Sequence, residues 1–229
     1  MSRDPASRSL SLSLRLEGRR AVVIGGGPVA ERKVRKLLAA GAAVTVISPA
    51  VTPGLAALPV TWLRRPFEPG DTRGALLTVA ATGLPEVDGA AAAEAEAEGR
   101  LALVAGDGEA GNAALMAELH RGPVTVAVAT GGASPALARR IREAIAPVIG
   151  PEYGALAHLL GRLRRRLKQQ PGLSRADRSH LLRSVALGSA LERLARGEAV
   201  ESLLEEIMKE LAAHERQGDP RPAGGAGEA

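Results

Sequence analysis

The sequence predicts an α/β protein in which a parallel β-sheet, with helices on both faces, is followed by a smaller all-helical domain. Two observations lead to this prediction. Between residues 20 and 130, short apolar runs alternate with longer helical patterns, which is typical of a parallel sheet covered by helices. After Gly132 only helical patterns follow, punctuated by Pro147, Pro151 and Pro171.

Six short apolar runs are the predicted strands. They cover residues 21–24, 43–47, 60–63, 75–81, 101–105 and 124–129. The helices predicted between them cover residues 28–40, 85–99 and 111–120, and Gly41 is suited to end the first of these helices. Such βαβ units connect with a right-handed crossover. Open parallel sheets built from them bind ligands at the carboxyl ends of the strands, so we expect ligands there.

The second half of the chain contains four helical patterns and then a change of composition. The patterns cover residues 134–150, 151–170, 174–196 and 198–216. The last thirteen residues, QGDPRPAGGAGEA, are rich in Gly, Pro and Ala, so we expect residues 217–229 to be a disordered tail.

Composition excludes several classes of function. The chain has 229 residues and no cysteine, which removes disulfides, thiolate catalysis and zinc-finger chemistry. A net charge of +5 suits either a nucleic acid or a small polyanion as partner. Only Trp62, Phe67 and Tyr153 are aromatic, which leaves little for stacking on bases, so we expect no nucleic-acid partner.

Neither a membrane nor a resident metal is expected. The N-terminal residues contain no continuous apolar region of the signal-peptide kind, and no later run approaches the roughly 18 apolar residues of a membrane span. We therefore expect a cytoplasmic protein. The four histidines are widely spread and no HExxH motif occurs, so we expect no catalytic metal site.

The stretch AVVIGGGPVAERKVRKLL contains the most informative motif. Gly25, Gly27 and Ala30 fit the G-x-G-x-x-G/A pattern, in which glycines allow a tight turn and a close approach to a pyrophosphate. Pro28 suits the first turn of the following helix, whose free N–H groups favour phosphate. The motif predicts a Rossmann-like dinucleotide-binding domain; the alternative is a glycine-rich turn that binds nothing.

One expected part of such a site is missing. An acidic residue normally ends the second strand and binds the ribose hydroxyls, but here the strand is followed by SPAVTPG, and the next acid is Glu68. Ser48 and the nearby backbone could take over this contact. The choice between NAD and NADP therefore cannot be made from the usual acidic residue.

Three stretches together resemble a known family. They are LEGRRAVVIGGGPVAERKVRKLLAAGAAVTVISP, LLTVAATGLPEV and GPVTVAVATGGASPALARRIREAI, and they fall within residues 10–150. They resemble the precorrin-2 dehydrogenase / sirohydrochlorin ferrochelatase family, which forms the N-terminal module of siroheme synthases. The segment TGGASPALAR, which leads from a strand into a helix, is the most specific of the matches.

The resemblance implies a function and a domain organisation. Members oxidise precorrin-2 to sirohydrochlorin with NAD, some also insert iron, and they form homodimers. The implied domains are an NAD-binding domain (1–112), a dimerisation segment (113–150) and a helical domain over the substrate site (151–216). We expect dehydrogenase activity and leave ferrochelatase activity open.

The resemblance also implies site residues. Those expected to bind the cofactor are Gly25, Gly27, Pro28, Val29, Ser48, Pro49 and Thr82. Those expected to bind the tetrapyrrole, which carries eight carboxylates, are Thr130, Ser134, Arg139 and Arg140. Simpler roles remain open for the second group: a helix cap for Ser134, a solvated helix face for the arginines and an ordinary strand end for Thr130.

The chain departs from the family at one catalytic position. The aspartate proposed as the acid/base group of the family aligns with Gly106, and Asp107 is its neighbour. Either the loop shifts by one residue so that Asp107 serves as the catalytic group, or the chain lacks it. The second possibility motivates an alternative function, a non-catalytic dinucleotide-binding sensor.

Overall fold

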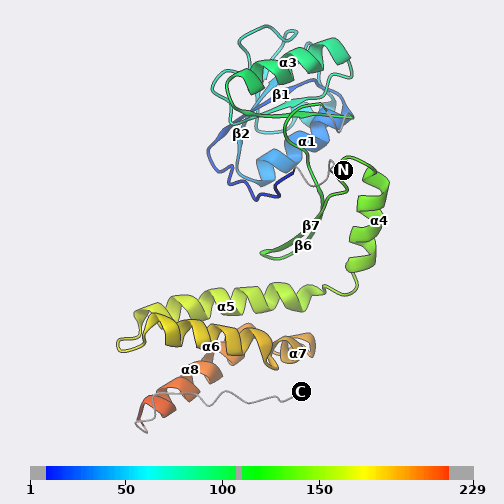
Figure 1. The fold of residues 1–229 in the computed structure, drawn as a ribbon. Coiled ribbons are helices and arrows are strands. Elements are labelled where there is room, and N and C mark those ends of the chain that lie inside the picture. Colours follow the sequence, from blue (N-terminus) through cyan, green and yellow to red (C-terminus); the bar gives the residue numbers. More distant parts are fainter. Residues whose placement is uncertain (1–8, 107–109, 217–229) are drawn as a thin grey trace, which may run out of the picture. The chain divides into compact units, whose positions relative to one another are not determined.

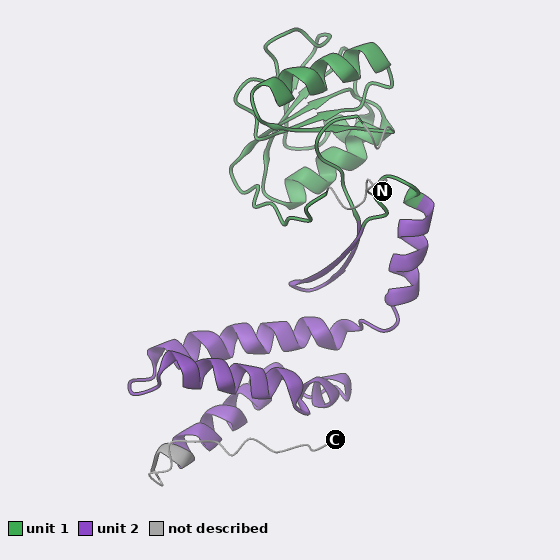
Figure 2. Cartoon of the chain, in the orientation of Figure 1, with its two compact units in different colours: residues 1–116, 129–135 green, residues 117–128, 136–229 purple. Residues whose placement is uncertain are grey.

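The structure, a computed structural model, describes residues 9–106 and 110–216, which form two compact units (Figures 1 and 2). The first unit comprises residues 1–116 and 129–135, and the second comprises residues 117–128 and 136–229, within the described ranges. The tail predicted over 217–229 and the candidate residue Asp107 both lie outside the described residues.

The first unit contains a five-stranded parallel sheet in the order β3-β2-β1-β4-β5. Its strands are β1 (Arg20–Ile24), β2 (Ala43–Ile47), β3 (Thr61–Leu63), β4 (Leu77–Ala80) and β5 (Leu101–Val104). All of its neighbouring strands pair in parallel, which confirms the predicted fold class and five of the six predicted strands as members of this sheet. The order reverses between β1 and β4, so a crevice is expected at their carboxyl ends.

Alternate residues of β1 pack to opposite faces of the sheet, and helices cover both (Figure 1). On one face Val23 packs with Val34 of α1 (Pro28–Ala39), beside the short α2 (Pro53–Ala56). On the other face Val22 packs with Ala91 of α3 (Pro85–Ala97). The buried residues of α3 are mostly alanines, which allow the helix to lie close to the strands.

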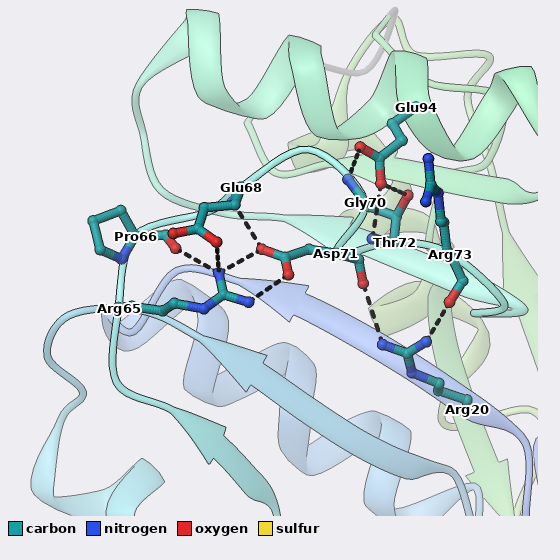
Figure 3. A network of polar contacts seen from close by, with 9 residues as sticks. All are labelled: Arg20, Arg65, Pro66, Glu68, Gly70, Asp71, Thr72, Arg73 and Glu94. Carbon is teal, nitrogen blue, oxygen red and sulfur yellow. Dashed lines mark hydrogen bonds and ion pairs between the residues drawn. The ribbon is translucent and has the colours of Figure 1, made fainter.

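The connection from β3 to β4 crosses the sheet without a helix and is held by polar contacts (Figure 3). Within it, Arg65 binds both carboxylate oxygens of Asp71, at 2.6 and 2.8 Å. Glu94 of α3 accepts hydrogen bonds from the backbone N–H of Gly70 (2.6 Å) and of Thr72 (2.9 Å), and from the Thr72 hydroxyl (2.5 Å). These carboxylates replace the apolar packing that a crossover helix would supply.

The second unit begins with a hairpin of β6 (Ala117–Arg121) and β7 (Val124–Val128), joined by Gly122 and Pro123. The helix predicted over residues 111–120 is wrong. Helix propensity is a weak preference, and here residues 117–121 pair with the valine-rich β7 across a two-residue turn in which Gly122 has a φ of 53°.

Helices form the rest of the second unit (Figure 2). They are α4 (Pro135–Ile145), α5 (Pro151–Gln169), α6 (Arg175–Leu187), α7 (Ala190–Ala195) and α8 (Val200–Arg216). The single helix predicted over 174–196 is divided at Gly188, whose extended backbone ends α6. Leu159, Leu163 and Leu167 of α5 are fully buried in the core of this unit. Within the described ranges, no helix is both long and apolar enough to cross a bilayer.

We predict that the Glu94→Ala variant loses about 2 kcal/mol of unfolding free energy at neutral pH, because it leaves the donors of the buried Thr72 and the half-buried Gly70 without their acceptor. Burial alone would raise the pKa of Glu94, but the hydrogen bonds from Thr72 and Gly70 outweigh burial and hold this pKa below its ordinary value of 4.5. The Glu94 contribution is therefore present above that value and lost as the pH falls below it.

Urea unfolding at neutral and acidic pH measures both effects. The gap in stability between wild type and Glu94→Ala should narrow as the pH falls through the pKa of Glu94. Glu96→Ala, at an exposed position of the same helix, is the matched control. Equal losses in the two variants would contradict the assignment.

Candidate dinucleotide-binding site

The candidate site lies where the carboxyl ends of β1 and β4 meet. Gly25 follows β1 and donates its N–H to the carbonyl of Ile47 at the end of β2 (2.9 Å). Ala81 follows β4 and donates its N–H to the carbonyl of Ile24 (2.8 Å). The turn after β1 is thus fixed between its two neighbouring strands, at the position where open parallel sheets bind ligands.

Close backbone approaches account for the first two glycines of the turn. Gly25 has a φ of 117°, and a Cβ atom at this position would lie 2.3 Å from the carbonyl oxygen of Ala81. A Cβ atom on Gly26 would lie 1.9 Å from the carbonyl oxygen of Ala50. The Gly26 requirement was missed from the sequence because the fingerprint leaves this position unspecified, and it depends on the loop that follows β2.

Gly27 differs from its two neighbours. It is the N-cap of α1 with a φ of −78°, and no described atom lies within 4 Å of a Cβ added there. Pro28 occupies the first turn of α1, and Val29 is 40% exposed. A glycine that the fold itself does not require, in front of the positive end of a helix, fits the close approach of a pyrophosphate.

The loop after β2 holds Ser48 and Pro49 at the same edge of the sheet. The buried Ser48 donates its hydroxyl to the carbonyl of Ala50 (2.7 Å), and its own carbonyl accepts the indole N–H of Trp62 (2.9 Å). Pro49 is exposed. Ser48 therefore shapes the loop that packs on Gly26, and its side chain lies next to the glycine turn.

Glu31, in the first turn of α1, fixes the continuation of this loop. Its carboxylate accepts the Thr52 hydroxyl (2.5 Å) and forms an ion pair with Arg35 (2.6 Å). The hydrogen bond from Thr52, supported by that from Arg35, holds the pKa of Glu31 below its ordinary value. This carboxylate is thus engaged by the protein itself.

Thr82 follows β4, and its position depends on Asp88, a residue that the sequence analysis did not single out. The carboxylate of the buried Asp88 accepts the Thr82 N–H (3.0 Å), the Thr82 hydroxyl (2.8 Å) and the Gly83 N–H (3.1 Å). A signal was available, since Asp88 lies four residues after Leu84, in the first turns of α3, where carboxylates stabilise helix starts.

The residue after β5 that aligns with the family aspartate has an unusual backbone. Gly106 has a φ of 95°, a region that side-chain-bearing residues rarely adopt, so an aspartate would be strained here. The neighbouring candidate, Asp107, lies outside the described residues.

The expected substrate residues fall in both units. In the first unit the Thr130 hydroxyl donates to the carbonyl of Ser134 (3.0 Å) and accepts the Ser134 N–H (3.2 Å), which closes the turn before α4. In the second unit Arg139 and Arg140 are exposed on α4. The described residues contain no group of three or more His, Cys, Asp or Glu side chains arranged to hold a metal ion.

The two glycines at the start of α1 make a matched pair for testing the site. We predict that Gly27→Ala keeps the thermal stability of the wild type but binds NAD about tenfold more weakly, because its methyl group enters the space needed by the pyrophosphate. Gly26→Ala should instead lower the melting temperature, since its methyl group collides with Ala50. Calorimetry measures the affinity for NAD, and thermal unfolding measures the stability of each variant. Undiminished NAD affinity in Gly27→Ala would refute the placement of the pyrophosphate beside Gly27.

Comparison with known proteins agrees with the predicted cofactor and family. Residues 12–117 match the family model described as putative NAD(P)-binding, in agreement with the predicted NAD cofactor, and residues 121–146 match that of the sirohaem biosynthesis protein central region. Siroheme synthase 1 of Aeromonas salmonicida is 39% identical over 191 residues, which are 80% of this chain and 41% of that protein. The siroheme synthase of Methylococcus capsulatus is 39% identical over 222 residues, 95% of this chain and 46% of that protein.

A solved structure extends the similarity to the fold. SirC, a precorrin-2 dehydrogenase, superposes with a TM-score of 0.72 at 25% identity, over 88% of this chain and 100% of that chain. The chain spans less than half the length of the siroheme synthases cited above. Through both family models, these relatives and this structure, the chain belongs to the family of precorrin-2 dehydrogenases and the corresponding part of siroheme synthases.

Proposed function

We propose that this protein is an NAD-dependent precorrin-2 dehydrogenase that forms sirohydrochlorin for siroheme synthesis. The observation that carries the proposal is the glycine turn at the β1–β4 crevice, in a chain related over its sheet and central region to siroheme synthases. In the reaction, precorrin-2 loses a hydride to NAD and a proton to a base or to water, which gives sirohydrochlorin and NADH. The siroheme synthase and SirC relatives give no support to the alternative, a non-catalytic sensor.

The residues of the crevice would bind and orient the dinucleotide. Gly25, Gly27, Pro28 and Val29 line the turn that would receive the pyrophosphate, and Ser48 and Pro49 would lie on its adenosine side. Thr82, held by Asp88, would lie on the nicotinamide side. When bound, NAD supplies the hydride acceptor. The contribution of the protein is to hold the ring against the reacting carbon.

The tetrapyrrole would be recognised through its carboxylates. We propose that Thr130, Ser134, Arg139 and Arg140 contact it, because hydroxyl and guanidinium groups donate hydrogen bonds to carboxylates. The support is their clustering in sequence, around a closed turn and an exposed helix face.

The proposed acid/base group comes shortly after β5 in the sequence. We propose that Asp107 takes this role, since Gly106 before it offers no side chain. Hydride transfer depends mainly on positioning, whereas metal insertion requires that pyrrole protons be removed, so iron insertion would need the base more than dehydrogenation does.

We also propose that the protein is a cytoplasmic homodimer formed through residues 113–150. The β6–β7 hairpin supports this, because a two-stranded ribbon needs further packing for stability. Leu119, Val124, Val126 and Val128 of this hairpin are only half-buried in the single chain. A dimeric mass in light scattering is expected, and a monomeric one would count against the segment as an interface.

The first test is an anaerobic incubation of the full chain with enzymatically prepared precorrin-2 and NAD. We expect NADH absorbance and the sirohydrochlorin spectrum to rise together. The Gly27→Ala variant is the matched control and should form NADH more slowly when NAD is below saturation. The absence of both signals from a wild-type protein that binds NAD would reject dehydrogenase activity and leave the sensor alternative.

Ferrous iron added after the first reaction tests the role of Asp107. The Asp107→Asn variant should slow siroheme formation more than NADH formation, because the amide cannot accept pyrrole protons. Unchanged rates of both steps would remove Asp107 from the mechanism.

A further inference from the structure

The ends of β2 and β3 carry a charge pattern that the proposed reaction does not use. We propose that the adenosine end of the site accepts the 2′-phosphate of NADP, and that Arg64 is the residue that binds this phosphate. The inference rests on the proposed dinucleotide-dependent dehydrogenation and extends the range of cofactors that the site binds from NAD to NADP.

Arg64 lies beside the ribose position of the Rossmann-like sheet. Ile47, the last residue of β2, pairs with Leu63, the last residue of the parallel β3. The next residues along, Ser48 and Arg64, therefore leave the sheet at the same edge. The Ser48 N–H continues the ladder to the carbonyl of Leu63 (3.2 Å). In this fold the end of β2 faces the 2′ position of the adenosine ribose.

No carboxylate stands at this edge to bind ribose hydroxyls or to repel a phosphate. From the end of β2 to Phe67 the sequence contains no acidic residue. The nearest acids on either side are already engaged: Glu68 lies 3.6 Å from Arg65, and Glu31 is bound to Thr52 and Arg35. A carboxylate at this position favours NAD, whereas an arginine accommodates NADP.

The charge of Arg64 is available to a ligand. Its guanidinium is exposed and lies 5.3 Å from the centre of the Trp62 ring, and no carboxylate of the described residues forms an ion pair with it. Its neighbour Arg65 contrasts with it, because Arg65 binds Asp71 through two nitrogen atoms. Two adjacent arginines thus serve different purposes, one within the fold and one at the edge of the site.

The stacking on Trp62 suits a phosphate contact. Guanidinium groups stack on aromatic faces and still present N–H groups at their edges, and these bind phosphate oxygens in pairs. The indole is itself fixed, because its N–H donates to the Ser48 carbonyl (2.9 Å). The Ser48 hydroxyl already donates its hydrogen to the carbonyl of Ala50. Arg64 is therefore the residue at this edge that offers charged N–H donors to a 2′-phosphate.

Calorimetry on the full chain tests this inference with two pairs of ligands: NADP and NAD, and adenosine 2′,5′-bisphosphate and AMP. At low ionic strength we expect the 2′-phosphorylated member of each pair to bind more tightly. Arg64→Ala should reduce the ratio of NADP to NAD affinity about tenfold, and added salt should reduce the same ratio in the wild type.

Two further variants sharpen the test. Arg100→Ala removes an exposed arginine at the opposite end of the strands, just before β5, and should leave the ratio unchanged. Arg64→Lys retains the charge without the planar donor pair and should give an intermediate ratio. Thermal unfolding confirms that each variant is folded.

The outcomes separate the inference from the function on which it rests. If NAD and AMP bind but the 2′-phosphate weakens binding, or if Arg64→Ala weakens both members of each pair equally, the inference is overturned and the dinucleotide function stands. If no nucleotide binds to the wild type, both are overturned.

Discussion

The close packing of the glycine turn against the two neighbouring strand ends is the constraint on which the rest of the first unit depends. Gly25 leaves no room for a side chain beside Ala81, and Gly26 leaves none beside Ala50. Because the turn is held on both sides, α1 starts at a fixed point beside the carboxyl ends of β1 and β4. By contrast, no atom of the described residues lies within 4 Å of a Cβ added to Gly27, so the packing of the fold does not itself require a glycine there.

Helix α3 fixes both ends of β4 with two carboxylates. Glu94 holds residues 70–72 before the strand, and Asp88 holds residues 82–83 after it. The alanines between and beside them let the helix approach the sheet closely enough for these short side chains to reach backbone N–H groups. The same helix thus stabilises the helix-free crossover through Glu94 (Figure 3) and fixes the residues after β4 through Asp88.

Local patterns in the sequence were sufficient to predict the strands of the sheet, α1, α3 and the glycine turn, because apolar periodicity and glycine spacing are properties of single segments. Of the hairpin, the strand β7 was predicted, but β6 was missed because it is stabilised by its pairing with β7 rather than by its own composition. The roles of Asp88, Glu94 and Gly26 were missed for a related reason. Each depends on a contact with a loop that only the folded chain brings close.

The single tryptophan of the chain gives the molecule a built-in optical reporter of one edge of the sheet. Trp62 is hydrogen-bonded to Ser48 and lies beneath Arg64, so its fluorescence senses the carboxyl ends of β2 and β3 without any label. It belongs to the first unit, whereas most of the helices belong to the second. Fluorescence therefore reports the first unit, whereas the far-ultraviolet circular dichroism signal comes mostly from the helices of the second. Coincident unfolding curves from the two probes are expected if the two units unfold as one cooperative system.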